Sequence, residues 1–259
     1  MSFSIAWLDL REPADHAARD LNLLQRSVEW LRQANHATVV DLGSGTGSTL
    51  RAFGEAAKTF QWRLIDIDKT LLNEANRRHS DLSITIHPIN LTEIEQLPLK
   101  NAALVSASAL FDLASRQFCD RLIKRLQTHN IGLYAALNYD GVTGWWPNHP
   151  ADELILKSFN RDQLRDKGFG PALGPDAAYY LADRLHMSGF DVSIKPSPWH
   201  LGSAEQQLTE ELVRGIASAV VGDPSLDAKT VEDWLNFRLD NAKDGSCIVG
   251  HLDLLALPR

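Results

Sequence analysis

The strongest hydrophobic segments of the chain are short runs of about five residues, separated by longer stretches with a helical alternation of apolar and polar positions. Such runs are typical of strands buried on both faces, as in a parallel sheet covered by helices. The alternation of strand and helix therefore predicts an α/β fold with a doubly wound, mostly parallel sheet. The five runs of the first half are ATVVDLG (37–43), WRLIDID (62–68), SITIHPI (83–89), ALVSASAL (103–110) and IGLYAALNY (131–139).

The regular alternation stops after Tyr139. Residues 140–176 hold five glycines and four prolines, and a connection of this length is typical of a functional insertion in an α/β enzyme. The final run, SCIVGHLDLLALP (246–258), predicts an antiparallel edge strand whose apolar pattern is broken by His251 and Asp253. The remaining predicted elements are helices over 48–58, 70–79, 115–129, 177–187, 204–221 and 226–241, and a sixth strand over 190–194.

The pattern shows no linker between two folding units. Residues 1–36 predict one or two helices ahead of the sheet, and 140–176 is the insertion. We therefore expect one domain over 1–259.

Composition narrows the classes of partner. The 259 residues carry a net charge of −7, which argues against general attraction to nucleic acid or an anionic membrane. Neither a signal sequence nor a membrane-spanning apolar run is apparent. Cys119 and Cys247 are too few for a disulfide framework, and the nine histidines show no metal-binding spacing. We expect a cytoplasmic protein that acts on a small molecule without a metal.

The stretch DLGSGTG, residues 41–47, indicates a ligand that approaches the backbone closely at the end of a buried strand. A phosphate-binding P-loop needs Gly-Lys-Ser/Thr, whereas Gly47 is followed by Ser48. A dinucleotide fingerprint beginning at Gly43 needs a glycine where Ser48 stands. Asp41 also opposes a dinucleotide, because its carboxylate would repel the pyrophosphate.

The pattern Asp-x-Gly-x-Gly-x-Gly resembles motif I of the class I S-adenosylmethionine-dependent methyltransferases. S-adenosylmethionine carries an ammonium group that Asp41 attracts, directly or through water. The resemblance implies a seven-stranded sheet, an N-terminal helical lid, and S-adenosylhomocysteine as product.

Residues beyond the motif fit the same resemblance. Asp66 ends the second strand, where an acid binds the ribose hydroxyls, and Ile67 packs on adenine. Asn90 stands where the family often has an acid for the adenine amino group, and Arg19 is expected to bind the cofactor's carboxylate. The expected cofactor-binding residues are Arg19, Asp41, Gly43, Ser44, Gly45, Gly47, Asp66, Ile67, Asn90, Leu91 and Ser106.

In this fold the methyl acceptor lies beyond the fourth and fifth strands. Asp112 is the expected general base, with Tyr139 and His149 as further catalytic residues. The segment SASALFD (106–112) lacks the [DNS]PP[YFW] pattern of amino-methylating enzymes. Neither cysteine follows a proline, as cytosine methylation requires, and the acids of the metal-dependent catechol type are missing. We expect methylation of a small molecule, at oxygen.

Large rings and cations of the insertion are the expected substrate contacts. Aromatic rings suit a flat or apolar acceptor, and cations suit a carboxylate or phosphate on it. The expected residues are Phe111, Trp145, Trp146, Arg161, Lys167 and Trp199.

Three other functions stay open from the residues alone. They are a non-catalytic S-adenosylmethionine-binding partner subunit, an NAD(P)-dependent oxidoreductase and, less favoured by the charge, a nucleic-acid methyltransferase. The sequence leaves open whether the protein is a monomer or a homodimer.

Overall fold

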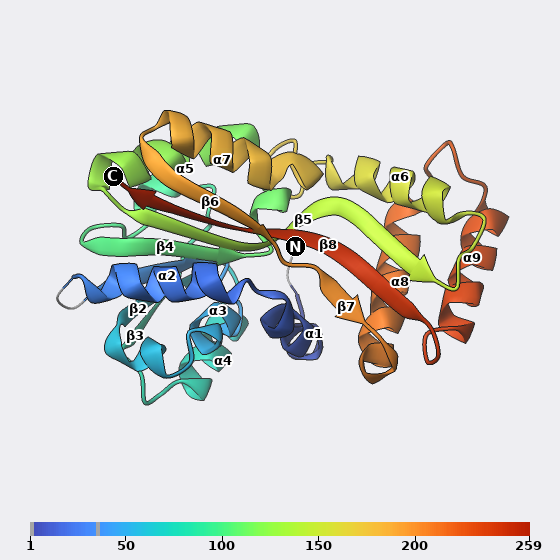
Figure 1. Cartoon of the computed structure of the whole chain (residues 1–259), viewed down its shortest axis with the longest axis horizontal. Coiled ribbons are helices and arrows are strands. Elements are labelled where there is room, and N and C mark those ends of the chain that lie inside the picture. Colours follow the sequence, from blue (N-terminus) through green and yellow to red (C-terminus); the bar gives the residue numbers. More distant parts are fainter. Residues whose placement is uncertain (1–2, 35–36) are drawn as a thin grey trace.

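The computed structural model describes residues 3–34 and 37–259. Within these residues the core of the molecule is an eight-stranded sheet of order β3-β2-β1-β4-β5-β8-β6, with β7 paired to β8 (Figure 1). The strands are β1 (Thr38–Leu42), β2 (Gln61–Asp66), β3 (Ile84–Pro88), β4 (Ala102–Ser108), β5 (Gly132–Trp146), β6 (Phe190–Pro196), β7 (Trp199–Leu201) and β8 (Ser246–Pro258).

The doubly wound, mostly parallel α/β sheet is confirmed. Strands β1 to β5 pair in parallel, and β8 runs antiparallel to both of its long neighbours. The prediction that the last strand lies at an edge is wrong, because β8 lies between β5 and β6. Leu254, Leu255 and Ala256 are fully buried on alternating faces, as a central strand requires. The three-residue strand β7 is an addition to the seven that were expected.

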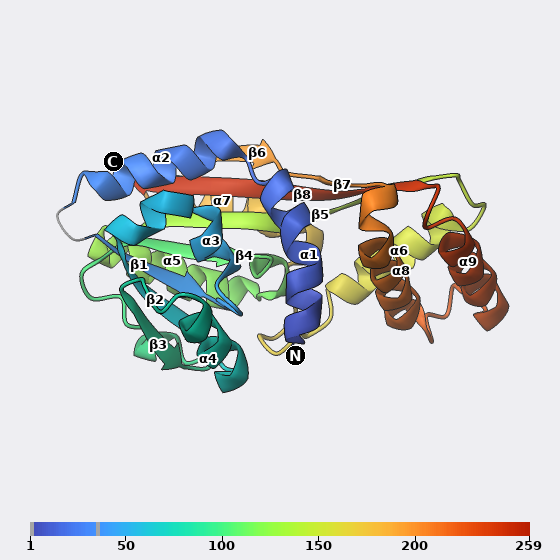
Figure 2. The same cartoon turned by 90° about the horizontal axis from the view of Figure 1, so that it is seen from below.

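Helices cover both faces of the sheet and give it two apolar cores (Figures 1 and 2). Val39 faces one core and Val40 the other, which explains the unbroken apolar run of β1. The predicted helix 48–58 is interrupted at Gly54, whose φ of +55° breaks the helical path. The helices are α1 (Ile5–Ala18), α2 (Leu21–Arg32), α3 (Ser48–Ala52), α4 (Lys69–Arg78), α5 (Arg116–His129), α6 (Asp152–Gln163), α7 (Ala177–Met187), α8 (Gln206–Val220) and α9 (Ala228–Asp240), with short 3-10 turns η1 (Gly54–Thr59), η2 (Ile94–Gln96), η3 (Phe111–Leu113), η4 (Gly174–Asp176) and η5 (Ser203–Glu205).

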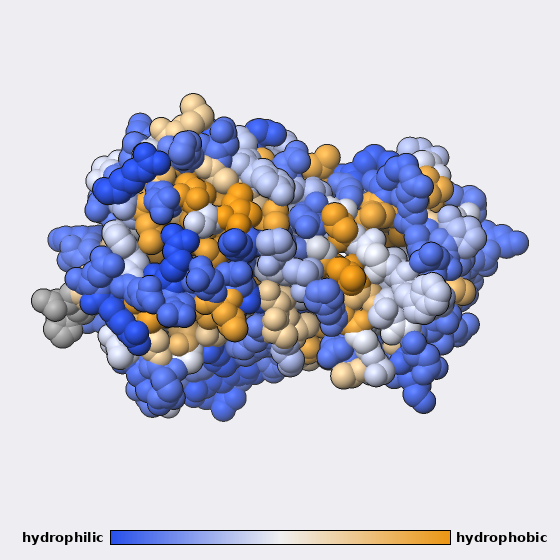
Figure 3. Space-filling model, viewed as in Figure 1, coloured by the Kyte–Doolittle hydropathy of each residue, from blue (hydrophilic) through white to orange (hydrophobic). Residues whose placement is uncertain are grey.

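Strands β5 and β8 continue far beyond the main sheet and form an extension with β7. Helices α6, α8 and α9 lie on one side of this extension (Figure 2) and share an apolar cluster with Ile155 and Trp234 at its centre. The opposite side carries apolar side chains (Figure 3), and Val142, Trp146 and Ile248 are exposed.

The segment 140–176 is therefore more regular than the sequence suggested. Residues 140–146 belong to β5, and α6 follows after a short turn. Its role on the substrate side, and the single-domain division of the chain, stay predictions.

Candidate functional site

The glycine loop follows β1 and turns three times through left-handed backbone. Gly43, Gly45 and Gly47 have φ values of +64°, +52° and +87°, which a residue with a Cβ adopts only at a cost. The backbone N–H of Ser44 donates to the carbonyl of Ile65 at 2.9 Å. These left-handed angles explain why every second residue is a glycine. The loop thereby presents backbone without side chains at the end of the sheet.

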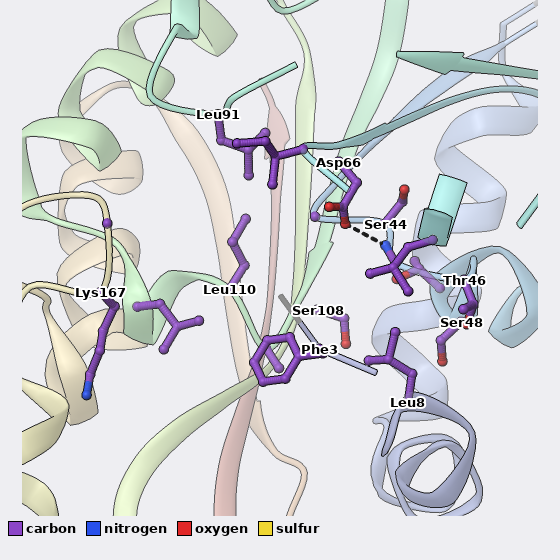
Figure 4. Close-up of a pocket in the computed structure, with 18 of the residues that line it drawn as sticks. Phe3, Leu8, Ser44, Thr46, Ser48, Asp66, Leu91, Ser108, Leu110 and Lys167 are labelled. Carbon is purple, nitrogen blue, oxygen red and sulfur yellow. Dashed lines mark hydrogen bonds between the residues drawn. The ribbon is translucent and has the colours of Figure 1, made fainter. Parts of the chain in front are cut away.

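A cavity of about 330 Å³ lies over this loop at the carboxyl ends of the parallel strands (Figure 4). Helix α1 covers it from the other side with Phe3, which precedes the helix, and with Leu8 and Arg11. Ser108, the last residue of β4, and Leu110, just after the strand, also line it. Seven of the predicted cofactor residues line the cavity, namely Gly43, Ser44, Gly45, Asp66, Ile67, Asn90 and Leu91.

Asp41 lies behind the loop and is 1% exposed. Its Oδ1 accepts a hydrogen bond from the Ser106 hydroxyl at 2.6 Å, while its Oδ2 has no partner. Burial raises the pKa of Asp41 to about 7, because an apolar environment disfavours the charged carboxylate. The neighbouring Ser44 hydroxyl is also buried and without a partner. A cation or donor at this end of the cavity would therefore stabilise the ionised acid.

Arg19 is buried just after α1, close to the same wall. Its Nη2 donates to the Ser108 hydroxyl at 3.0 Å, whereas Nε and Nη1 have no partner. The side chain does not line the cavity, but Ser108 does. The guanidinium also interacts with Tyr134, Asp253 and Asp15. Its two nitrogens without a hydrogen-bond partner suit an anionic group better than an apolar one.

Asp66 closes the glycine loop against β2. Its Oδ2 accepts the backbone N–H of Gly45 at 3.0 Å, drawn dashed in Figure 4, and Oδ1 accepts the N–H of Asp68 at 2.9 Å. The side chain is half-buried and faces the cavity. Asn90 differs from expectation, because its Oδ1 already accepts from the N–H and hydroxyl of Thr92 and so is engaged in a local turn.

Replacement of Asp66 by alanine should weaken binding of S-adenosylmethionine by about 1.5–3 kcal/mol, the scale of hydrogen bonds to an ionised group. Calorimetry of the purified variant measures the change. Asp81→Ala is the matched control, because Asp81 is exposed and lies outside the cavity. Equal affinities for the two variants would remove Asp66 from the site.

Two of the predicted catalytic residues are buried and do not line the cavity. Asp112, in η3, is 8% exposed, and burial raises its pKa to about 6. The Tyr139 hydroxyl donates to Asn160 Oδ1 at 2.8 Å, and burial raises its pKa to about 12. Asp112 is thus able to accept a proton near neutral pH, whereas Tyr139 stays protonated.

Several predicted residues are not brought to the cavity. The His149 ring accepts the N–H of Ala151 through Nδ1 and contacts Phe237 in the extension. Trp145 packs on Trp234, with 5.8 Å between ring centroids. Three others lie away from the cavity as well. Trp146 is exposed, Arg161 binds Asp223 through two nitrogens, and Phe111 is fully buried in a core.

The last two substrate residues are nearer but already paired. Lys167 lines the cavity, yet its Nζ donates to Asp162 at 2.6 Å and points away from Asp66 (Figure 4). Trp199 is buried, and its Nε1 donates to Asp15 Oδ1 at 3.0 Å. Substrate roles for these residues stay predictions.

The sequence pointed to Arg11 and Arg19 in the expected helical lid and favoured Arg19, but it did not single out the other residues of α1 that cover the cavity. Leu8, Arg11 and Asp15 line it together with Phe3, but on a helix they read as ordinary amphipathic positions. The polar residues of β8 were the available signal for buried chemistry, because His251 and Asp253 interrupt an otherwise apolar strand.

Among residues 3–34 and 37–259, no cluster of three or more histidine, cysteine or acidic side chains is arranged to hold a metal ion. The same residues include no helix long and apolar enough to cross a membrane.

No protein-family model and no curated protein sequence matches the chain. Solved structures do match. The cyclopropane synthase MmaA2 from Mycobacterium tuberculosis aligns with 98% of this chain and 94% of its own, at 13% identity and a TM-score of 0.55. A SAM-dependent methyltransferase from Thiobacillus denitrificans, solved with S-adenosyl-L-homocysteine, aligns over 100% of both chains at 14% identity and a TM-score of 0.50. An O-methyltransferase family protein from Burkholderia thailandensis aligns with 95% of this chain and 57% of its own, at 11% identity and a TM-score of 0.50.

The first two alignments extend over nearly the whole of both chains. The protein has the fold of the class I S-adenosylmethionine-dependent methyltransferases. At such low identities the likeness defines the fold, and the chemistry has to be argued from the residues of the cavity.

Proposed function

We propose that the protein transfers a methyl group from S-adenosylmethionine to a small-molecule acceptor. The observation that carries the proposal is a left-handed glycine loop with one acid, Asp66, lining the cavity beside it and a second acid, Asp41, buried behind it. A pyrophosphate-bearing nucleotide would bring its negative charge close to both acids. S-adenosylmethionine instead offers an ammonium and a diol, which are both donors to carboxylates.

The unpaired polar atoms match the charges of the cofactor's amino-acid end. Asp41 Oδ2 and the Ser44 hydroxyl have no hydrogen-bond partner and can accept from a donor. Arg19 Nε and Nη1 also have no partner and can donate to an acceptor. We assign Asp41 and Ser44, with Ser106 behind them, to the ammonium, and Arg19 to the carboxylate. The Asp66 carboxylate is assigned to the ribose hydroxyls. Ile67 and Leu91 line the cavity and are assigned to pack on the adenine ring. Asn90 Nδ2 is assigned to donate a hydrogen bond to the edge of that ring.

The reaction needs alignment and removal of a proton. When bound, the cofactor supplies an electrophilic methyl group, so the protein has to hold a nucleophile in line with it. Asp112 is the group suited to accept the nucleophile's proton, since its pKa of about 6 leaves it ionised at neutral pH. We propose oxygen as the methylated atom, because a hydroxyl nucleophile has a proton that a general base has to remove.

Photochemical labelling tests the proposed cofactor directly. Irradiation of the protein with radiolabelled S-adenosylmethionine should label it, excess S-adenosylhomocysteine should block the labelling, and excess NAD should not. Labelling that NAD blocks equally well would instead favour a nicotinamide enzyme.

Replacement of Asp112 by asparagine should lower turnover about 100-fold, the scale of one general base, with little change in cofactor affinity. Turnover of the wild-type protein should also fall as the pH drops through about 6, because the protonated carboxyl accepts no further proton. Asp183→Asn, at an exposed position, is the control. Undiminished turnover in Asp112→Asn would exclude it as the base.

A further inference from the structure

The guanidinium of Arg51, in α3, lies beside the glycine loop and uses all five of its N–H groups. Nε and Nη2 donate to the two carboxylate oxygens of Glu12, with 2.6 Å between Nε and Oε1. Nη1 donates to the Thr46 carbonyl at 2.6 Å and to His79 Nε2 at 2.8 Å, and Nη2 also donates to the Thr46 hydroxyl at 3.2 Å. A two-nitrogen contact with a carboxylate is stronger and more directional than a single hydrogen bond.

The three partners of Arg51 belong to different elements. Glu12 is part of α1, which covers the cavity, whereas Thr46 is part of the glycine loop and lines the cavity. His79 ends α4. Burial, and after it the charge of Arg51, lowers the pKa of His79, so the ring is neutral at pH 7 and Nε2 can accept a hydrogen bond. One guanidinium therefore joins the covering helix to the glycine loop.

Gly47 leaves room for this contact. Its φ of +87° by itself favours glycine. A Cβ built there would also lie 3.3 Å from His79 Cδ2 and Nε2, and 3.6 Å from Arg51 Nη1. The third glycine of the loop thus accommodates the Arg51–His79 pair.

Helix α1 is held from two sides. Its apolar residues pack against the cluster around Trp199 in the extension. Toward the glycine loop it is held by the Glu12–Arg51 ion pair, whose side chains are 16% and 21% exposed. Pro13 follows inside the helix and has no N–H to donate to the Asp9 carbonyl, so the helix itself is weakened beside this ion pair. The position of the first half of α1 therefore depends on its side-chain contacts.

The same half of α1 faces the cavity. Leu8 lines it, and a Cβ built on Gly45 would lie 3.1 Å from Leu8 Cδ1. Leu8 and Thr46 lie at the same end of the cavity (Figure 4). Glu12 is four residues beyond Leu8 and so lies on the same side of the helix. Separation of Glu12 from Arg51 would consequently carry Leu8 away from the loop.

We propose that Arg51 is a positioning residue for the cofactor: through Glu12 it holds α1 over the glycine loop, and the opening of this contact limits the release of a bound sulfur cofactor. The inference rests on the proposed function. Arg51 itself is not among the residues that line the cavity, so it acts on the ligand through α1 and Thr46. A weaker contact lets α1 open more often, which speeds both entry and exit of the ligand. Damage to the site would instead slow entry.

Glu12→Gln tests the contact from the side of α1, because it removes the charge and keeps the shape. Surface plasmon resonance on the immobilised protein measures the association and dissociation rate constants of S-adenosylhomocysteine. We expect dissociation to become at least about tenfold faster, the scale of losing a hydrogen bond between charged groups. The association rate constant should be equal to that of the wild type or greater.

Asp9→Asn is the matched control. The pair of Asp9 with Arg78 also joins α1 to a neighbouring helix, at 2.6 Å, but Asp9 is 44% exposed and the pair does not include the glycine loop. Exposed ion pairs contribute little, so dissociation should change by no more than about twofold.

A double variant tests whether Arg51 acts through Glu12. Arg51→Met removes every donor and keeps the length of the side chain. If the two residues act as one contact, adding Glu12→Gln to Arg51→Met should change the dissociation rate by no more than about twofold.

Hydrogen exchange tests the same contact without a ligand. In Glu12→Gln and in Arg51→Met, the amides of residues 5–12 should exchange at least about fivefold faster than in the wild type, because this half of α1 opens more often. The buried amides of residues 254–256 in β8 should keep their wild-type rates, which shows that both variants are folded.

The inference is overturned if Glu12→Gln releases the ligand at the wild-type rate, if its association slows, if Asp9→Asn has an equal effect, or if the effects of Glu12→Gln and Arg51→Met multiply. Its failure differs from that of the proposed function. If S-adenosylhomocysteine does not bind the wild-type protein, the proposed function is wrong, and the exchange of residues 5–12 alone decides whether Arg51 holds α1. If the ligand binds and these rates do not respond, only the role of Arg51 is wrong.

Discussion

Replacing Gly45 by valine is expected to abolish binding of S-adenosylmethionine, with affinity reduced at least about 100-fold. Gly45 has a φ of +52°, and a Cβ built there lies 3.1 Å from Leu8 Cδ1 of the covering helix. The branched side chain would occupy the space between the loop and α1 in which the ligand has to lie. It would also displace the N–H that donates to Asp66. Calorimetric titration measures the loss.

Gly54→Val is the matched control for this variant. Gly54 has nearly the same φ, +55°, but a Cβ there meets no atom within 4 Å. Both variants should lose about 1–3 kcal/mol of stability through backbone strain, and only Gly45→Val should lose the ligand. A folded Gly45→Val protein with normal affinity would refute the role given to the glycine loop.

Replacing Asp253 by alanine should destabilise the protein by about 3–5 kcal/mol, the scale of removing one member of a buried charge network. Asp253 is 0% exposed. Its oxygens accept the backbone N–H groups of Leu137 and Asp20 at 2.8 and 3.0 Å, and the charge of Arg19 lies nearby. Leu137 has a φ of +56° at an irregularity of β5, so the carboxylate fixes a strained turn of the chain.

Chemical denaturation followed by circular dichroism measures this change as a lower midpoint. Asp233→Ala, at an exposed position of α9, should change the free energy of unfolding by no more than about 0.5 kcal/mol. If the two variants were equally stable, the network of Asp253 would not hold α2 and β5 together.

Much of the fold and half of the site follow from local patterns in the sequence. The apolar runs specify strands because each alternate residue faces a different core, as Val39 and Val40 do. The glycine loop is local as well, because left-handed φ angles restrict the residue type directly. The prediction that Asp41 and Asp66 lie at the two ends of one ligand site depends only on the order of neighbouring strands, β1 and β2.

The extension was not predictable in the same way. Gly141 and Gly144 suggested turns, but the strand continues because its partner, Cys247 to Val249, lies about a hundred residues later. Such pairing is a long-range property that composition does not reveal. The ring of Trp145, a predicted substrate contact, packs against Trp234 in this extension, and its substrate role stays a prediction.

A helical lid was predicted, but which of its residues line the cavity was not, for a related reason. Arg11 acquires its position only when α1 folds over the loop, where Leu8 approaches Gly45. Polar residues inside an apolar strand indicated buried polar sites more clearly than the amphipathic pattern of α1 did. His251 and Asp253 share one face of β8, and each serves a distinct neighbourhood, the first beside Tyr139 and the second beside Leu137.

The most direct test of the central claim is calorimetric titration of the purified protein with S-adenosylmethionine, S-adenosylhomocysteine, NAD and NADP. We predict micromolar affinity for one or both sulfur compounds and no detectable heat from either nicotinamide. Binding of a nicotinamide alone would contradict the assignment of Asp41 to an ammonium. Binding of none of the four would contradict the proposed function altogether.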